Sequence, residues 1–219
     1  MTPPVFYNAG MAIVDPGIED YLRRVLPARE PVARDMEELA DRRGFPIVGP
    51  LVGRVLFLLA QSIAARTVFE CGSGYGYSAL WFARALPDGG RVILTDSDGG
   101  NCAAARDYLA RAGLESRADV RLGDGLALLE AESDPFDVIF CDIDKKDYPG
   151  IHPLLGPRLR RGGLFICDNM LWFGRVARED QQDDDTRGVR ELTRLLYDDP
   201  SLHTTILPLR DGVSVSLKL

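Results

Sequence analysis

The chain alternates short apolar runs with longer stretches in which apolar residues recur every three or four positions. The apolar runs predict buried strands, and the longer stretches between them predict amphipathic helices. The expected strands cover residues 67–71, 91–96, 118–122, 136–141 and 164–167, followed by 204–207 and 213–217. The expected helices cover residues 18–26, 31–43 and 50–64 before the first strand, and 77–86, 101–112, 125–131, 152–160 and 186–197 after it.

Strands that alternate with helices of this length form a parallel sheet covered on both faces. Only a short turn, Arg210-Asp211-Gly212, separates the last two strands, which predicts an antiparallel hairpin. We therefore expect an α/β, Rossmann-like fold whose seven-stranded, mostly parallel sheet has one antiparallel strand in the C-terminal hairpin. We expect a single domain over residues 1–219, with an N-terminal helical segment (1–44) added to the core (45–219). Asp185 is the expected N-terminal cap of the helix 186–197.

The composition of the 219 residues narrows the function classes. A formal net charge of −7 makes the surface repel phosphate backbones on average, so we expect no nucleic-acid partner. The four cysteines include no pair at CxxC spacing, which favours neither a disulfide framework nor a zinc site. No apolar run reaches membrane-spanning length, and the N-terminus lacks the features of a signal peptide. We therefore expect a cytoplasmic protein without a membrane partner.

Glycines cluster directly after the first expected strand, in the segment 70–78 (ECGSGYGYS). Sheets of this type bind ligands at the carboxyl ends of their strands. Gly72 and its neighbours allow a tight turn and a close approach to a ligand. The helix that begins near Ser78 offers free N–H groups to an anion such as a carboxylate. Asp96 ends the second strand, twenty positions after Gly76, where an acid accepts hydrogen bonds from both hydroxyls of a ribose.

Two nucleotide cofactors share this layout. A dinucleotide site has the pattern G-x-G-x-x-G, which Gly72 and Gly74 fit but Tyr77 does not. Glu70 would repel a pyrophosphate, whereas it would attract the ammonium group of a methionine moiety. The segment therefore favours S-adenosylmethionine over NAD, and the spacing to Asp96 disfavours a glycine turn that binds no ligand.

A second turn at the same edge, Gly123-Asp124-Gly125, follows the third expected strand. Asp124 is placed to accept a hydrogen bond from the amino group of adenine. It is almost equally well explained as the cap of the following helix, and the two roles are compatible.

Acidic and amide side chains follow two further strands. The fourth strand leads into Asp142, and the fifth leads into Asp168 and Asn169. Neighbouring strand ends would bring these three residues together, and their oxygen atoms suit a hard cation such as Mg²⁺, Ca²⁺ or Mn²⁺. The absence of histidine and cysteine from the set argues against zinc. From these residues alone, caps and loop acids remain the more common explanation.

The motifs together resemble the cation-dependent O-methyltransferases, the family that includes caffeoyl-CoA and catechol O-methyltransferases and bacterial relatives. The resemblance extends from about Gly44 to Lys218. This chain has Ile143 where many relatives have alanine, and it has the additional Gly74 of a subset of bacterial members. The motifs that carry it are Glu70-x-Gly72, Gly76-Tyr77-Ser78, Phe136-Asp137, Asp142-x-Asp144-Lys145, Gly162-Gly163, Asp168-Asn169-x-Leu171-Trp172-x-Gly174-x-Val176 and Leu207-Pro208-Leu209-Arg210-Asp211-Gly212.

The resemblance assigns roles that the residues alone left open. It implies that S-adenosylmethionine is the cofactor and that Asp142, Asp168 and Asn169 hold a divalent cation. It implies that Lys145 is the general base, although the residues alone favour a surface lysine paired with Asp144 or Asp147. The expected cofactor-binding residues are Val48, Glu70, Gly72, Ser73, Ser78, Asp96, Asp124, Gly125 and Asp142.

The expected activity is methylation of a hydroxyl on a small molecule, such as a catechol-type vicinal diol. Burial and a nearby cation would lower the pKa of Lys145, which suits a base. The alternatives are an NAD-dependent oxidoreductase and a non-catalytic module that binds the cofactor. A homodimer is expected from the resemblance only. The segment before Gly44 lies outside the resemblance, so the identity of the acceptor stays open.

Overall fold

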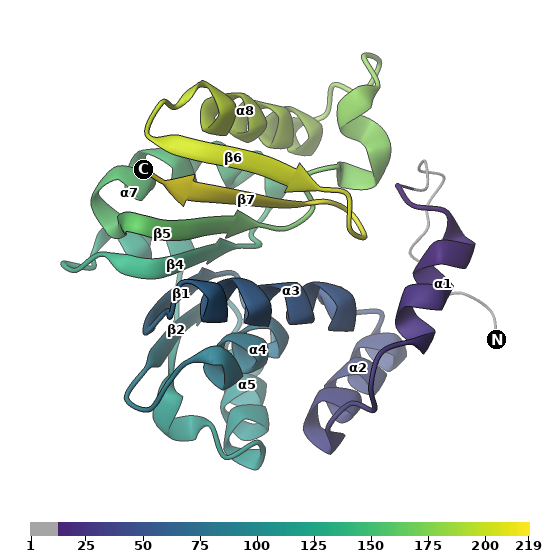
Figure 1. Ribbon diagram of the computed structural model, residues 1–219, viewed down its shortest axis with the longest axis vertical. Helices are drawn as coiled ribbons and strands as arrows, with labels where there is room; N and C mark the ends of the chain where they lie inside the picture. The colour runs from purple at the N-terminus through teal and green to yellow at the C-terminus, as the bar shows by residue number, and fades with distance from the viewer. Residues whose placement is uncertain (1–12) are drawn as a thin grey trace.

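The computed structural model describes residues 13–219, which form one seven-stranded sheet flanked by helices (Figure 1). The strand order is β3-β2-β1-β4-β5-β7-β6. The strands are β1 (Thr67–Cys71), β2 (Arg91–Asp96), β3 (Ala118–Leu122), β4 (Phe136–Cys141), β5 (Leu159–Cys167), β6 (Leu202–Leu207) and β7 (Val213–Lys218). The α-helices are α1 (Pro16–Arg24), α2 (Pro31–Arg43), α3 (Gly49–Ser62), α4 (Tyr77–Ala85), α5 (Gly99–Arg111), α6 (Gly125–Glu130), α7 (His152–Arg158) and α8 (Asp184–Asp198). The 3₁₀ segments are η1 (Glu115–Arg117), η2 (Lys145–Ile151) and η3 (Trp172–Ala177).

The sheet has the predicted topology. Strands β1 to β5 pair in parallel, and β7 runs antiparallel to both of its neighbours, β5 and β6. The expectation of one antiparallel strand within a C-terminal hairpin is therefore confirmed. The observed bounds of β1 to β4 coincide with the expected ranges. For β1, β2 and β4 the reason is that strands buried on both faces read as nearly continuous apolar sequence, whereas the edge strand β3 is only partly buried.

Successive residues of each central strand enter two different cores, since side chains alternate across a sheet. Val68 and Val138 pack with α2 to α5, whereas Phe69 and Ile139 pack with α6 to α8. Figure 1 shows α8 beside the β6–β7 hairpin and α3 to α5 grouped together on the other half. Helices α1 and α2 lie on the side toward which the arrows of β5 and β6 point, so the N-terminal helices stand at the carboxyl edge of the sheet.

Two local predictions were wrong. The helix expected to continue to residue 160 ends at Arg158, and β5 begins at Leu159 instead of residue 164. Leu159 is buried and pairs with Phe136, and the register shifts before Leu164 pairs with Val138. Gly162 and Gly163 lie within β5, and Gly162 has a positive φ of 71° in this irregular part of the strand.

The cap of α8 is Asp183, not the expected Asp185. The Asp183 carboxylate accepts hydrogen bonds from the Thr186 backbone N–H at 3.0 Å and from the Thr186 hydroxyl at 2.8 Å. A capping side chain reaches the N–H group three residues later, which Asp183 does here. Asp185 instead accepts a hydrogen bond from the backbone N–H of Lys146 at 3.2 Å.

All four cysteines are buried free thiols. Among residues 13–219, no helix combines the length and the apolar character that crossing a membrane requires.

Candidate active site

A cavity of about 760 Å³ opens at the carboxyl ends of β1 to β4. Every expected cofactor-binding residue except Glu70 lines it, so the tertiary structure gathers segments that lie up to about one hundred positions apart. Asp168 and Asn169 are not among the lining residues. The lining segments are 45–48, 72–74, 77–78, 95–97, 123–126, 142–147 and 149–150.

Glu70 lies beneath the cavity and is fully buried. One carboxylate oxygen accepts a hydrogen bond from the Ser78 hydroxyl, and the other accepts one from the Ser73 hydroxyl at 3.1 Å. Burial raises the pKa of Glu70 to about 8, although the two serine hydrogen bonds act in the opposite direction. Glu70 therefore orients two serines that line the cavity.

Asp96 ends β2 with its carboxylate held by the neighbouring backbone. One oxygen accepts a hydrogen bond from the Gly74 N–H at 2.8 Å, and the other accepts one from the Asp98 N–H at 2.8 Å. The Asn101 side chain donates to that second oxygen at 3.2 Å. These donors fix the direction of the acid that the sequence predicts as the ribose acceptor.

Small residues let the backbone close around the cavity. A Cβ at Gly125 would lie 2.9 Å from both the Cys71 Cβ and the Thr95 Oγ1, so only glycine fits there. Gly72 has a φ of 78° and lies against the backbone carbonyl of Asp142. Asp124 caps α6 by accepting from the Ala127 N–H at 2.8 Å, so the cap interpretation is confirmed.

Lys145 lies at the cavity wall and points at the predicted cation ligands. Its ammonium donates to a carboxylate oxygen of Asp142 at 2.8 Å and to the Ile143 carbonyl at 3.1 Å. It also lies 5.3 Å from the ring centroid of Tyr148 and 5.7 Å from that of Trp172. Its ion-pair partner is thus Asp142, and not Asp144 or Asp147, which the residues alone favoured.

The pKa of Lys145 is raised. Burial lowers it, as expected, but the carboxylates of Asp142 and Asp168 outweigh burial by stabilising the ammonium. The pKa of Lys145 would be lowered, as the sequence analysis expects, only if another cation bound these two carboxylates.

Asp168 is buried next to the same group. Burial and the charge of Asp142 raise the pKa of Asp168 to about 7, while Arg210 and Lys145 act in the opposite direction. Asn169 has a left-handed backbone with a φ of 57°, and its amide N–H₂ donates to Asp211 at 3.3 Å. That hydrogen bond leaves the amide oxygen of Asn169 as the atom available to a ligand.

The sequence did not identify Tyr148 and Asp211 as residues of this site. Tyr148 is fully buried, and its hydroxyl donates to the Asp168 carbonyl at 2.8 Å. Asp211 holds the Asn169 amide and also accepts a hydrogen bond from the backbone N–H of Phe173. In the sequence, Tyr148 and Asp211 stand out only because they lie in or near the family motifs. Position near a motif does not show which residues a side chain contacts.

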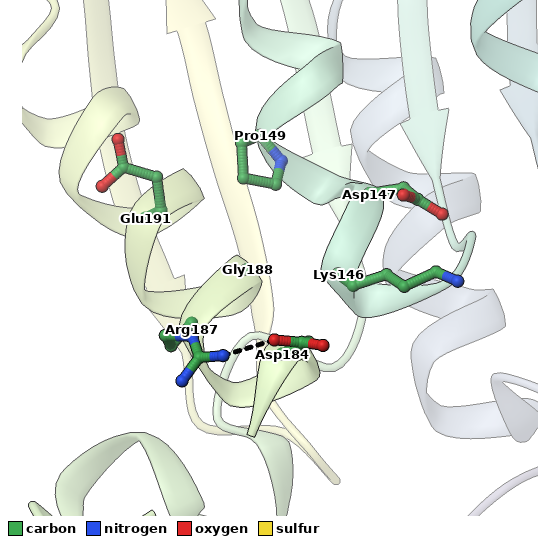
Figure 2. A pocket seen from close by; sticks show the side chains of 7 residues that line it. All are labelled: Lys146, Asp147, Pro149, Asp184, Arg187, Gly188 and Glu191. Atoms are coloured by element: carbon green, nitrogen blue, oxygen red, sulfur yellow. Dashed lines mark hydrogen bonds and ion pairs between the residues drawn. The ribbon is translucent and has the colours of Figure 1, made fainter. Parts of the chain in front are cut away.

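A second hollow, of about 450 Å³, lies between η2 and α8 (Figure 2). Figure 2 shows Arg187 paired with Asp184, and Lys146 directed away from both. Mainly charged side chains surround this groove, and α8 approaches the backbone of Lys145 at Gly188. The groove therefore shows where α8 supports η2, and the candidate chemistry remains in the larger cavity.

Comparison with known proteins agrees with this geometry. A family model described as O-methyltransferase matches residues 42–219. A catechol O-methyltransferase of Niastella koreensis is 35% identical over 179 residues, which cover 78% of this chain and 81% of that protein. Caffeoyl-CoA O-methyltransferase 1 of Eucalyptus globulus is 29% identical, with 89% and 85% covered. The solved O-methyltransferase of Bacillus cereus, in complex with SAH, is 29% identical with a TM-score of 0.84, and the match covers 93% of this chain and 97% of that one.

The matched residues include all the motifs that carry the sequence resemblance. The chain therefore belongs to the O-methyltransferase family.

Proposed function

We propose that this O-methyltransferase transfers the methyl group of S-adenosylmethionine to a hydroxyl of a small molecule with neighbouring hydroxyls, and that it requires a divalent cation. One observation carries the proposal. Lys145 and Asp142, both half-buried, form an ion pair at the wall of a cofactor-sized cavity, and the charge of the buried Asp168 acts on the same ammonium. A base and two carboxylates at this place suit deprotonation of a hydroxyl beside a bound cofactor.

The cavity suits S-adenosylmethionine in size and chemistry. Its volume of about 760 Å³ lies within the usual range for small-molecule sites. Asp96 offers oxygens to a ribose, and Ser73 and Ser78 face the region expected for the methionine moiety. Relatives support this choice, since the Bacillus cereus structure contains SAH and the structure of TomG from Streptomyces achromogenes contains SAM.

The alternatives from the sequence lose support. Tyr77 occupies the third glycine position of the dinucleotide motif, and its buried side chain donates a hydrogen bond to Glu37 at 2.7 Å. An NAD site therefore lacks the small residue that close helix–strand packing requires. A non-catalytic module does not need a lysine buried against two carboxylates.

The residues at the site fit a hard cation. Asp168 is a buried carboxylate beside Asp142, and two such acids are stabilised when a cation binds between them. Within residues 13–219, no three His, Cys, Asp or Glu side chains gather into a metal group, and the proposed third ligand is the amide oxygen of Asn169. When bound, the cation would lower the pKa of the acceptor hydroxyl.

Lys145 then has a defined role. Its amine takes the proton of the acceptor hydroxyl, and Asp142 holds the amine in place. Asp142 is also a proposed cation ligand, so a bound cation would weaken its stabilisation of the Lys145 ammonium. The neutral amine, which can accept a proton, would then be favoured. Alignment of the hydroxyl with the methyl group supplies much of the remaining rate enhancement.

We further propose that the enzyme is a cytoplasmic homodimer. Helix α1 exposes Ile18 and Tyr21, and Val25 directly after the helix is also exposed, at a spacing that suits packing against a partner. Four buried free thiols agree with a reducing compartment. Light scattering at micromolar concentration tests the dimer, and a monomer would refute it.

The test of the cation is methyl transfer to catechol with and without EDTA, together with the variant Asp168→Ala. We expect both chelation and the substitution to reduce turnover on the order of 100-fold, because the cation contributes several kcal/mol. Calorimetric binding of SAH should persist in the variant. Asp134→Ala, at an exposed acid in the loop before β4, is the matched control and should match the wild type. Undiminished transfer in EDTA would refute cation dependence.

A further inference from the structure

Arg210 occupies an unusual place in the β6–β7 turn. Its backbone has a φ of 51°, in the left-handed region that disfavours residues with a Cβ. Such a conformation persists only where the surrounding structure enforces it, and it occurs often at binding sites. The contacts of the Arg210 side chain therefore bear on the function of this turn.

The guanidinium of Arg210 reaches the wall of the cofactor cavity. Its Nη1 donates a hydrogen bond to the Ile47 carbonyl at 2.6 Å, across 163 positions of the chain. A Cβ at Gly49 would lie 2.9 Å from the same nitrogen, so the absence of a side chain there admits the guanidinium. Ile47 lines the cavity, whereas Arg210 lies beside it.

The turn that carries Arg210 lies against the segment that follows the proposed cation ligands, because the Met170 N–H donates to the Gly212 carbonyl and the Leu171 N–H donates to the Asp211 carbonyl, both at 2.9 Å. The charge of Arg210 also stabilises the carboxylates of Asp168 and Asp211 and so acts to lower the pKa of each. Arg210 thus lies near both the cavity wall and the cation ligands. A methyl acceptor must occupy this same region, because its hydroxyl has to reach the methyl group and the cation together.

The contacts within the protein use only part of the guanidinium. The hydrogen bond to the Ile47 carbonyl uses one N–H group, and the stabilisation of Asp168 and Asp211 acts through charge without a hydrogen bond. Among residues 13–219, Arg210 forms no ion pair, and the Ile47 carbonyl is the one atom that accepts a hydrogen bond from its side chain. The remaining N–H groups form a planar fork that matches a carboxylate.

We propose that Arg210 binds a carboxylate of the methyl acceptor, so that the enzyme prefers dihydroxylated aromatic acids over neutral catechols. The inference rests on the proposed function, since it places the acceptor beside the cofactor and the cation. Arg210 is in this role a specificity-determining residue, and the proton transfer remains with Lys145.

The experiment compares 3,4-dihydroxybenzoate with catechol as acceptors for the wild type, Arg210→Gln and Arg210→Gly. The readout is the ratio of kcat/KM for the acid to kcat/KM for catechol. We expect both substitutions to lower this ratio about 10-fold or more, because a charge-assisted hydrogen bond to the acid is lost. Arg210→Gly suits the left-handed backbone, so it tests the side chain even if Arg210→Gln folds poorly. Arg194→Gln, on the exposed face of α8, is the matched control and should keep the wild-type ratio.

Binding gives a second readout that needs no turnover. Calorimetric affinity for 3,4-dihydroxybenzoate, measured with SAH and Mg²⁺ present, should fall about 10-fold in both Arg210 variants. An unchanged affinity, or an equal loss of kcat/KM for both acceptors, would overturn the role of Arg210. Failure of the wild type to methylate either acceptor while it binds the acid through Arg210 would instead contradict the proposed vicinal-diol acceptor.

Discussion

Gly188 is the point at which α8 supports Lys145, the proposed general base, and replacing Gly188 with alanine tests that support. The added Cβ would lie 2.9 Å from the carbonyl carbon of Lys145 and from the Cα of Lys146, and closer still to the Lys145 carbonyl oxygen. These are backbone atoms and do not rotate away as a side chain would. Helix α8 and η2 must therefore separate by roughly 1 Å to restore ordinary contacts.

The two consequences of Gly188→Ala differ in size. Overpacking of this kind costs about 1–3 kcal/mol, and the higher helix propensity of alanine offsets about 1 kcal/mol of it. We expect a net loss of about 1 kcal/mol, which lowers Tm by about 2–4 °C in a protein of this size. The shift of Lys145 should matter more, because a misplacement of about 1 Å reduces turnover on the order of 100-fold.

The assay measures Tm by calorimetry and kcat with catechol as acceptor, alongside SAH binding. Gly99→Ala is the matched control, because a Cβ at this first residue of α5 would meet nothing within 4 Å. It should leave Tm and kcat near wild-type values. If Gly188→Ala has wild-type kcat and an unchanged or higher Tm, the contact between α8 and η2 does not position Lys145.

Two further predictions concern stability. Burial raises the pKa of Glu70 from 4.5 to about 8, so between these pH values the folded state binds more protons than the unfolded state and stability falls as pH rises. Glu70→Gln should flatten this part of the profile in urea unfolding from pH 5 to 8.5, and a parallel profile would show that Glu70 is not the group responsible. Asp183→Ala removes the cap of α8 and should cost about 1 kcal/mol, seen as a Tm lower by about 2–4 °C. Asp184→Ala, at the exposed neighbour, serves as its control, and equal losses in the two variants would argue against the cap.

Local sequence was sufficient where structure follows from short-range physics. The bounds of β1, β2 and β4 and the turn after β1 were predictable, because apolar runs and glycine clusters report burial and backbone freedom directly. The start of β5 was not, because the pairing of Leu159 with Phe136 depends on a register shift in a different strand. Asp183 and Asp185 are equally plausible caps in sequence, and only the position of Lys146 decides what Asp185 binds.

The candidate site also has features that the sequence predicts and features that it does not. The positions of Asp96, Asp142 and Asp168 at strand ends follow from the strand pattern, and the family follows from the motifs around them. The ion-pair partner of Lys145 could not be predicted in this way. The residues alone favoured Asp144 or Asp147, and in the structure the partner is Asp142. The burial of Glu70 beneath Ser73 and Ser78 could not be predicted either, although the sequence indicated Glu70 as a cofactor-binding residue.

The sequence by itself determined the order of the elements, the mostly parallel character of the sheet with its C-terminal hairpin, and the edge at which the chemistry lies, because these follow from the type of each element and the length of each connection. Only the tertiary structure decided that Arg210 meets Ile47, that Gly188 lies against Lys145, and that burial shifts the pKa of Asp168. The first two contacts join segments 163 and 43 positions apart, and the third depends on the removal of water by the whole fold. No local pattern encodes which distant groups become neighbours, or how much solvent they lose.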